Sequence, residues 1–168
     1  HAHRQSDNIA NARLLAEARA ATTLNGGHFA EILAVRTFAS GVPYLVLEYL
    51  EGEPLDELLA RRGHLSVDEA MWLFVETARA LEAAHRHGIV HRDIKPSNIF
   101  LSIDPATGAT VLKLLDLGIA KLDPLRALGG VSLTGATEAL GTPRYMSPEQ
   151  LTDSRSVEAS SDVWSLGV

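Results

Sequence analysis

Apolar residues recur at helical spacing between residues 67 and 86, and this segment is the clearest predicted element of the chain. Ser66 and Glu69 have the spacing of a capping box, in which each side chain accepts a backbone N–H at the helix start. Gly88 supplies a stop signal at the other end. The residues expected to face the core as one apolar stripe are Met71, Phe74, Val75, Ala78 and Leu81.

Two pairs of short apolar segments joined by turns predict antiparallel strands. Residues 32–38 and 44–50 flank a Gly-Val-Pro turn and are rich in β-branched or aromatic residues. Residues 98–102 and 110–115 flank a Pro-Ala-Thr-Gly turn and predict a hairpin. Between the first pair and the long helix, residues 51–54 are predicted to break the strand and to open a short helix at their proline.

The remaining segments predict helix near both ends of the chain and one long irregular loop. Residues 6–23 carry an apolar stripe and end before a Gly-Gly pair, and residues 164–168 look like the start of another helix. Residues 122–144 are rich in Gly, Ser and Thr and have no sustained period. A stretch of that length inside a compact domain is usually functional or disordered.

Composition narrows the function classes. The 168 residues are 46% hydrophobic, enough for one substantial core and short for two independent domains. A net charge of −6 without any run of Lys or Arg argues against a nucleic-acid binder with a broad basic face. The absence of Cys excludes disulfide scaffolds, Cys-ligated zinc and cysteine nucleophiles. No apolar run has membrane-spanning length, and a start at His1 rather than Met suggests a fragment.

The densest chemistry lies in residues 91–98, His-Arg-Asp-Ile-Lys-Pro-Ser-Asn, directly before a predicted strand. A carboxylate at Asp93 could accept a proton, and Lys95 could neutralise a developing negative charge. Asn98 offers an amide oxygen, and Asp116 at the end of the next strand offers a second hard oxygen ligand. Such a donor pair suits Mg²⁺, which keeps waters and phosphate oxygens in its shell, so these residues suggest phosphoryl transfer.

With these residues the sequence resembles the eukaryotic-type serine/threonine protein kinases, especially their bacterial branch. The matching motifs occur in the family's order and are residues 91–98, Leu115-Asp116-Leu117-Gly118, residues 141–149 and residues 162–167, with a hinge-like segment at residues 45–50. The resemblance implies an α/β (α+β) two-lobed kinase fold, present here in part. It also implies ATP and Mg²⁺ as cofactors, protein substrates with Ser or Thr, and a cytoplasmic domain.

The resemblance implies a role for each residue of the loop. Asp93 would be the catalytic base that orients the substrate hydroxyl, and Lys95 would contact the γ-phosphate. Asn98 and Asp116 would be the two magnesium ligands. Such roles fit a loose transition state, which needs positioning and charge neutralisation more than covalent help.

Further residues would bind nucleotide and peptide. Leu47 would be the gatekeeper, the backbones of Glu48 and Leu50 would bond adenine, and Phe100 would pack beneath it. Thr142 looks like the threonine that lines the peptide site. These assignments also rest on the resemblance.

A regulatory set follows from the same resemblance. Arg92 would pair with a phosphate on the activation loop, with Thr134 the first choice for that phosphate and Thr137 and Ser132 the next. Glu17 would form an ion pair with a strand lysine in the family's small lobe.

The chain departs from the family pattern at several points. Leu117 stands where Phe is usual, and no Gly-rich phosphate loop or Val-Ala-Ile-Lys-like strand occurs. We therefore expect residues 1–50 to be a partial small lobe and residues 51–168 a partial large lobe. The polypeptide alone is expected to be inactive, and its full-length parent could be membrane-anchored.

Other interpretations of the same residues remain open. The fold could serve a pseudokinase or scaffold, or a small-molecule phosphotransferase, although the intact catalytic motifs and residues 141–149 disfavour them. The histidines His85, His87 and His91 could form a zinc cluster. Asp162 could cap its own helix or, as in the family, hold the backbone amides of the loop at residues 91–98.

Overall fold

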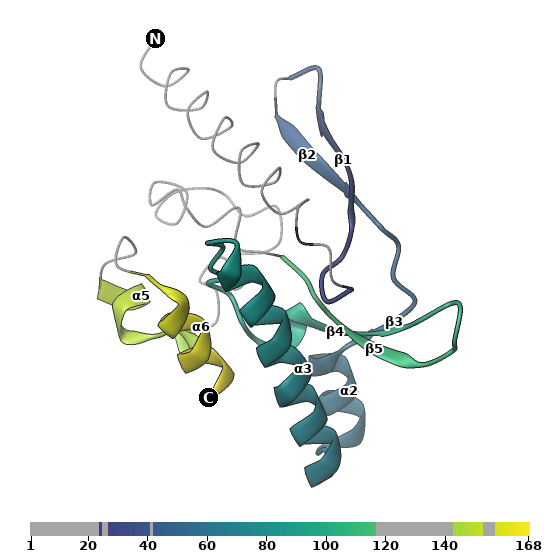
Figure 1. The fold of residues 1–168 in the computed structure, drawn as a ribbon, viewed down its shortest axis with the longest axis vertical. Helices are drawn as coiled ribbons and strands as arrows, with labels where there is room; N and C mark the ends of the chain where they lie inside the picture. The colour runs from purple at the N-terminus through teal and green to yellow at the C-terminus, as the bar shows by residue number, and fades with distance from the viewer. Residues whose placement is uncertain (1–23, 25–26, 41, 117–142, 153–156) are drawn as a thin grey trace.

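The computed structural model describes residue 24 and residues 27–40, 42–116, 143–152 and 157–168. Figure 1 shows their arrangement. The elements in chain order are β1 (Ile32–Thr37), β2 (Pro43–Leu47), β3 (Gly52–Pro54), α2 (Leu55–Arg62), α3 (Val67–Arg86), the 3-10 turn η1 (Pro96–Asn98), β4 (Ile99–Ile103), β5 (Thr110–Leu114), the 3-10 turn η2 (Pro143–Tyr145), α5 (Pro148–Thr152) and α6 (Ala159–Leu166). The expected mixture of helices and antiparallel strands is confirmed.

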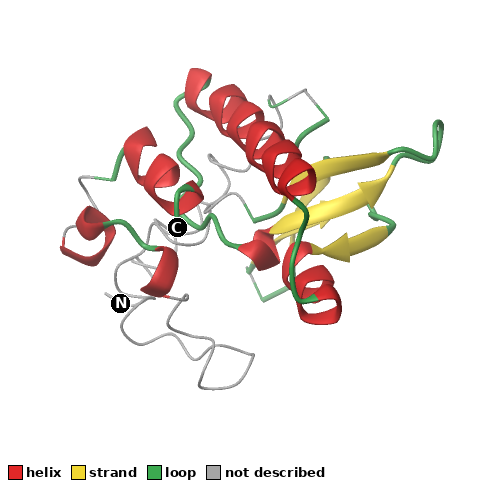
Figure 2. Ribbon diagram, turned by 90° about the horizontal axis from the view of Figure 1, so that it is seen from below, coloured by secondary structure: helices red, strands yellow, loops and turns green. Residues whose placement is uncertain are grey.

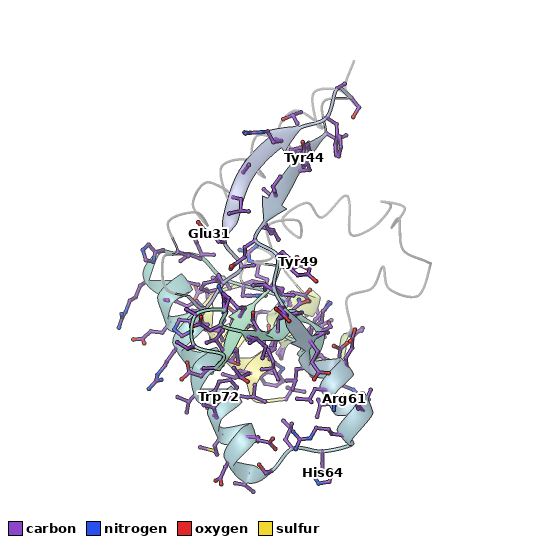
Figure 3. All side chains as sticks on the ribbon, turned by 90° about the vertical axis from the view of Figure 1, so that its right-hand side faces the viewer. Glu31, Tyr44, Tyr49, Arg61, His64 and Trp72 are labelled. Atoms are coloured by element: carbon purple, nitrogen blue, oxygen red, sulfur yellow. The ribbon has the colours of Figure 1, made fainter. Side chains whose placement is uncertain are left out.

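The described strands form two separate antiparallel sheets. β1 and β2 pair with each other, as expected, and extend away from the helices (Figures 1 and 3). The second sheet has the order β3-β4-β5 and contains the predicted hairpin. In Figure 2, α3 and the shorter α2 lie next to this sheet.

Residues 51–54 were predicted to break the strand and to open a short helix, and the structure adds a short strand that was not predicted. Gly52 to Pro54 form β3, in which Gly52 pairs with Ser102 and Pro54 with Phe100 of β4. Glycine permits this pairing, because Gly52 has φ +146 and a Cβ built there would lie 2.0 Å from the carbonyl oxygen of Leu101. The short helix α2 then begins at Leu55, close to its predicted start.

The core lies between α2, α3 and one face of the three-stranded sheet. Leu112 and Leu114 of β5 and Ile99 of β4 are buried there against α2 and α3. Leu58 of α2 and Leu81 of α3 belong to the same cluster. Burial of this apolar surface from water is the main stabilising contribution to the fold.

The predicted apolar stripe of α3 was wrong in most of its members. Met71, Phe74 and Val75 are 57%, 48% and 38% exposed, whereas Leu81 is buried as expected. The face that packs against β5 and α6 contains no aromatic residue, and its buried members are Leu73, Thr77, Ala80, Leu81 and Ala84. Apolar residues occupy more than one face of this helix, so periodicity alone selected the wrong one.

The predicted capping box at the start of α3 is confirmed. Ser66 Oγ accepts the Glu69 N–H at 3.2 Å, and the Glu69 carboxylate accepts the Ser66 N–H at 2.8 Å. The same carboxylate binds both guanidinium nitrogens of Arg62, at 2.7 and 3.1 Å. The end of α2 is thereby tied to the first turn of α3.

The pH dependence of stability tests this network. The hydrogen bonds from Arg62 and Ser66 hold the pKa of the Glu69 carboxyl at about 2. Because the folded protein prefers the ionised carboxylate, its stabilisation is complete above the ordinary pKa of 4.5 and is lost as the pH falls from 4.5 towards 2. We expect Glu69→Gln to lower the urea midpoint at pH 7, and this difference to shrink at pH 3. A difference that is constant between these two pH values would contradict the assignment.

Candidate active site

The loop between α3 and β4 brings a cation and an amide next to the carboxylate of Asp93. Asp93 Oδ2 lies 3.2 Å from Lys95 Nζ and accepts a hydrogen bond from Asn98 Nδ2 at 3.0 Å. Asn98 Nδ2 also donates to the Asp93 carbonyl at 2.7 Å. The turn η1 brings Asn98 back towards Asp93, because Pro96 at its start presets the backbone for the turn. Three of the predicted residues therefore lie in one cluster.

The amide of Asn98 is oriented so that its oxygen can serve a ligand. Both hydrogen bonds to Asp93 are made by Nδ2, an assignment that follows from these acceptors, so Oδ1 points away from them. The Leu115 N–H donates to the Asn98 carbonyl at 2.9 Å, which places Asp116 one residue beyond this contact. Together Asn98 and Asp116 offer the hard oxygen donors that Mg²⁺ prefers, so the residues fit this ion.

The buried carboxylate of Asp162 in α6 binds the backbone of the loop that carries Asp93. Asp162 is 1% exposed, and its oxygens accept the N–H groups of His91 at 2.8 Å and Arg92 at 2.7 Å. His85 Nε2 donates a third hydrogen bond to the same carboxylate at 2.7 Å. Asp162 lies inside α6, whose N-cap position is Glu158, so it holds the loop amides and does not cap its own helix.

Arg92 has a left-handed backbone conformation at this point. Its φ is +65, which costs on the order of 1 kcal/mol for a residue with a side chain. The hydrogen bond to Asp162 and a second one, from Gln150 Nε2 to the Arg92 carbonyl at 2.8 Å, hold both sides of the residue. The backbone direction from Arg92 into Asp93 is therefore fixed.

His91 is a structural residue of the site. It is fully buried, and its Nε2 lies 3.0 Å from the Leu115 carbonyl, to which it donates. Burial lowers the pKa of His91, and the carboxylates of Asp162 and Asp93 offset this only in part. Its Nδ1 has no hydrogen-bond partner among the described residues.

The zinc interpretation of the three histidines was wrong for the described residues. The described residues contain no group of three His, Cys, Asp or Glu side chains that could hold a metal ion. Each histidine has another partner, because His85 binds Asp162, His87 lies 2.9 Å from the Ala83 carbonyl, and His91 binds Leu115.

The elements from residue 143 onwards are also tied to the site. Glu149 of α5 accepts a hydrogen bond from Ser161 of α6, which lowers the pKa of the Glu149 carboxyl. Ser165 Oγ donates to the Tyr145 carbonyl at 2.6 Å. With Gln150 bonded to Arg92, α5, η2 and α6 form one support beneath the loop.

The hinge-like segment is joined to the second sheet by an ion pair. Glu48 Oε1 accepts a hydrogen bond from Lys113 Nζ of β5 at 2.6 Å and from the Glu31 N–H at 2.9 Å. Burial alone would raise the pKa of the Glu48 carboxyl, but Lys113 and Glu31 outweigh it and the net shift is downward. Phe100 is the β4 partner of Lys113, so both side chains lie on the same sheet face.

The structure describes the residues that were predicted to bind adenine, but not all of the other predicted site residues. Leu47 is exposed at the end of β2, Leu50 is half-buried, and the Glu48 N–H is already used by the Glu31 carbonyl at 2.9 Å. An adenine could therefore use only the Glu48 carbonyl of that residue. The predicted residues that lie outside the described part are Glu17, Leu117, Ser132, Thr134, Thr137 and Thr142.

Three supporting residues were missed from the sequence. His85, Lys113 and Gln150 reach partners that are 77, 65 and 58 residues away. No local spacing could show these contacts. Only a chemical hint was available for Lys113, which is the one charged residue of β5.

Comparisons with known proteins give a consistent result. The profile described as protein kinase domain matches residues 2–168. The serine/threonine-protein kinase AfsK of Streptomyces coelicolor is 36% identical over 161 residues, which are 96% of this chain and 19% of that protein. PknB of Mycobacterium tuberculosis is 40% identical over 131 residues, which are 78% of this chain and 20% of that protein. The chain spans about a fifth of the length of these curated relatives.

A solved structure is similar in fold. The crystal structure of the Mycobacterium tuberculosis PknI kinase domain matches with a TM-score of 0.69 at 25% identity, covering 95% of this chain and 53% of that one. Within the described residues, no helix has the length and apolar character needed to cross a membrane.

Replacing Asp162 by Asn tests whether this carboxylate organises the loop. One oxygen would become an NH₂ group that faces a donor, and two charge-assisted hydrogen bonds to the loop would be weakened. We expect the free energy of unfolding to fall by about 2–4 kcal/mol, because a buried group loses its partners. Asp68→Asn, at an exposed carboxylate in α3, should change it by less than about 0.5 kcal/mol. Equal effects in urea denaturation would contradict the role of Asp162.

Proposed function

The chain belongs to the protein kinase domain family, and on that premise we propose that the protein containing it transfers the γ-phosphate of ATP to Ser and Thr hydroxyls of protein substrates. The observation that carries this proposal is the cluster of Asp93, Lys95 and Asn98 in a loop fixed by a buried carboxylate. Phosphoryl transfer requires positioned charges more than a covalent intermediate, and this loop supplies an acid, a cation and an amide in fixed relation.

Asp93 is the proposed base. Its carboxylate would accept a hydrogen bond from the substrate hydroxyl, orient the oxygen towards the γ-phosphorus, and take up the proton as the new bond forms. Lys95 Nζ, 3.2 Å from this carboxylate, could contact Asp93 and a phosphate oxygen together. Asn98 would hold Asp93 through its Nδ2 while its Oδ1 remains for a metal.

Asn98 and Asp116 are the proposed magnesium ligands. When bound, the ion would neutralise charge on the phosphate oxygens of ATP. Supporting this, the end of β5 is joined to the loop at two points, since both the N–H and the carbonyl of Leu115 bond to it. Asp116 follows Leu115 directly and has φ +52.

Adenine, peptide and regulatory contacts complete the proposal. Leu47, the backbones of Glu48 and Leu50, and Phe100 would surround adenine, with Phe100 and Lys113 on one sheet face as support. Thr142 would contact the substrate peptide. The proposed switch pairs Arg92 with a phosphate on Thr134 or, failing that, Thr137 or Ser132, and Glu17 would bind a strand lysine.

The lobe boundary and the cellular setting are also proposals. Residues 1–50 would belong to the small lobe and residues 51–168 to the large lobe, which is supported by the separation of β1–β2 from the β3-β4-β5 sheet. The domain would work in the cytoplasm, where ATP and Mg²⁺ are available, also if the full-length protein is membrane-anchored.

Replacement of Asp93 by Asn in the full-length protein tests the proposed base. The amide cannot accept the proton, so we expect phosphate transfer to a Ser-containing protein to fall roughly 10²–10⁴-fold, with ATP affinity nearly unchanged. Transfer is measured with labelled ATP and affinity by equilibrium binding. Asp68→Asn serves as the control, and normal transfer by Asp93→Asn would remove Asp93 from the mechanism.

Replacement of Lys113 by Met tests the support of the hinge-like segment. Loss of the bond to Glu48 would loosen the backbone proposed to bind adenine, while the loop around Asp93 would be untouched. We expect KM for ATP to rise about threefold to tenfold and kcat to change little, because this hydrogen bond is charge-assisted. Arg36→Met, at an exposed cation on β1, is the control. A fall in kcat with constant KM would contradict the assignment.

A further inference from the structure

Arg144 is an exposed cation that has no partner in the described part of the chain. It lies in the turn η2, and no ion pair or hydrogen bond joins its guanidinium to another described residue. Six other described cations each bind a carboxylate, and they are Arg61, Arg62, Arg79, Arg86, Lys95 and Lys113. In a chain with 21 acidic and 15 basic residues, the charge of Arg144 is therefore available to a ligand.

The acidic residue nearest to Arg144 in the sequence is bound elsewhere. Glu149 accepts a hydrogen bond from Ser161 Oγ of α6, which lowers the pKa of the Glu149 carboxyl. This bond holds the carboxylate against α6, so Glu149 does not neutralise Arg144. The other unpaired described cations are Arg36, on the separate β1–β2 sheet, and Arg92, for which a phosphate is the proposed partner.

The backbone on both sides of Arg144 is held in place. The Met146 N–H donates to the Pro143 carbonyl at 3.2 Å, which closes the turn around Arg144. Ser165 Oγ of α6 donates to the Tyr145 carbonyl at 2.6 Å, and Ser165 is only 7% exposed. The turn is thus fixed to the buried side of α6 while the Arg144 side chain stays in solvent.

The same side of α6 fixes the loop that carries Asp93. Asp162 accepts the Arg92 N–H at 2.7 Å, and Asp162 and Ser165 are three residues apart on one helix. Side chains at this spacing share a helix face, with their Cβ atoms about 5–6 Å apart. Asp93 follows Arg92 and Arg144 precedes Tyr145, so each lies one residue from an anchor on neighbouring positions of α6.

A second connection links the two segments through α5. Ser147 and Gln150 bond to each other, since the Ser147 N–H donates to Gln150 Oε1 at 2.9 Å. Gln150 Nε2 then donates to the Arg92 carbonyl at 2.8 Å. An extended peptide spans about 3.3 Å per residue, so a peptide that presents Ser or Thr to Asp93 has its next few residues within reach of Arg144.

We propose that Arg144 determines substrate specificity by binding an Asp or Glu side chain that lies within a few residues of the Ser or Thr to be phosphorylated. The guanidinium has two parallel N–H groups that match the two oxygens of a carboxylate. This inference rests on the proposed kinase function and adds a class of substrate to it.

The overall charge of the chain makes such a preference diagnostic. With a net charge of −6, the chain as a whole repels an acidic peptide. A preference for acidic substrates must therefore come from a local cation. Lys95 is already bound to Asp93, at 3.2 Å, which leaves Arg144 as the exposed cation beside the site.

Peptide phosphorylation by the full-length protein tests the proposal. The reference peptide is Gly-Gln-Gln-Gln-Thr-Gln-Gln-Gln-Gly, and two further peptides carry Glu in place of the three Gln before or after Thr. A fourth and a fifth carry Lys at the same places. We expect one acidic peptide to exceed the reference in kcat/KM by about threefold to tenfold, mainly through a lower KM, because the contact is an exposed ion pair with paired hydrogen bonds.

Variants of the arginine identify the contact. Arg144→Gln should bring the ratio of kcat/KM for the acidic and reference peptides to within about 1.5-fold. Arg144→Glu should reverse the preference, so that the corresponding Lys peptide becomes the better substrate. Arg36→Gln removes an equally exposed and unpaired cation from β1 and is the matched control, in which the ratio should not change.

Three results would overturn the proposal. The first is that neither acidic peptide exceeds the reference peptide. The second is a preference that persists in Arg144→Gln. The third is an equal loss of preference in Arg144→Gln and Arg36→Gln, which would assign the effect to overall charge and not to a contact.

Binding of the same peptides separates this inference from the proposed function. If no peptide is phosphorylated, fluorescein-labelled peptides are measured by fluorescence anisotropy. Tighter binding of an acidic peptide that Arg144→Gln weakens at least threefold would support the Arg144 contact although transfer had failed. Equal binding of the acidic and reference peptides would overturn it.

Discussion

The buried carboxylate of Asp162 is the constraint on which the geometry of the site depends. It accepts two backbone N–H groups from the loop and one ring N–H from His85, all between 2.7 and 2.8 Å. A carboxylate at 1% exposure is costly unless its oxygens are satisfied, and these three donors satisfy it. The same contacts hold Arg92 at φ +65, a conformation that persists only where the surroundings over-determine it. The position of Asp93, the next residue, follows from this conformation of Arg92.

The second acidic residue is placed by the same kind of backbone contact. Leu115 donates its N–H to Asn98 and accepts a hydrogen bond from His91 at its carbonyl, so the end of β5 is joined to the loop on both sides. Asp116 then leaves with φ +52. Asp93 and Asp116, 23 positions apart in the sequence, are thus each one residue beyond a fixed backbone. This explains how two short irregular segments can each carry a carboxylate at a fixed backbone position without regular secondary structure.

The sequence predicted those features whose causes are local. The capping box needs only Ser66 and Glu69 at a spacing of three, and the β4–β5 hairpin needs only a turn between apolar segments. The buried face of α3 depends on which side of the helix β5 and α6 approach, and small residues such as Ala80 and Ala84 permit that approach while Phe74 stays exposed. The contact of His85 with Asp162 depends on the tertiary fold for the same reason.

The two faces of the β3-β4-β5 sheet make different contacts. One face carries Phe100 and Lys113, and Lys113 reaches across to Glu48 of the hinge-like segment. The other face supplies the core against α2 and α3 with Ile99, Leu112 and Leu114. The residues around Asp93 are joined to α6 through Asp162 and, through η1, also pack against α2 and β3.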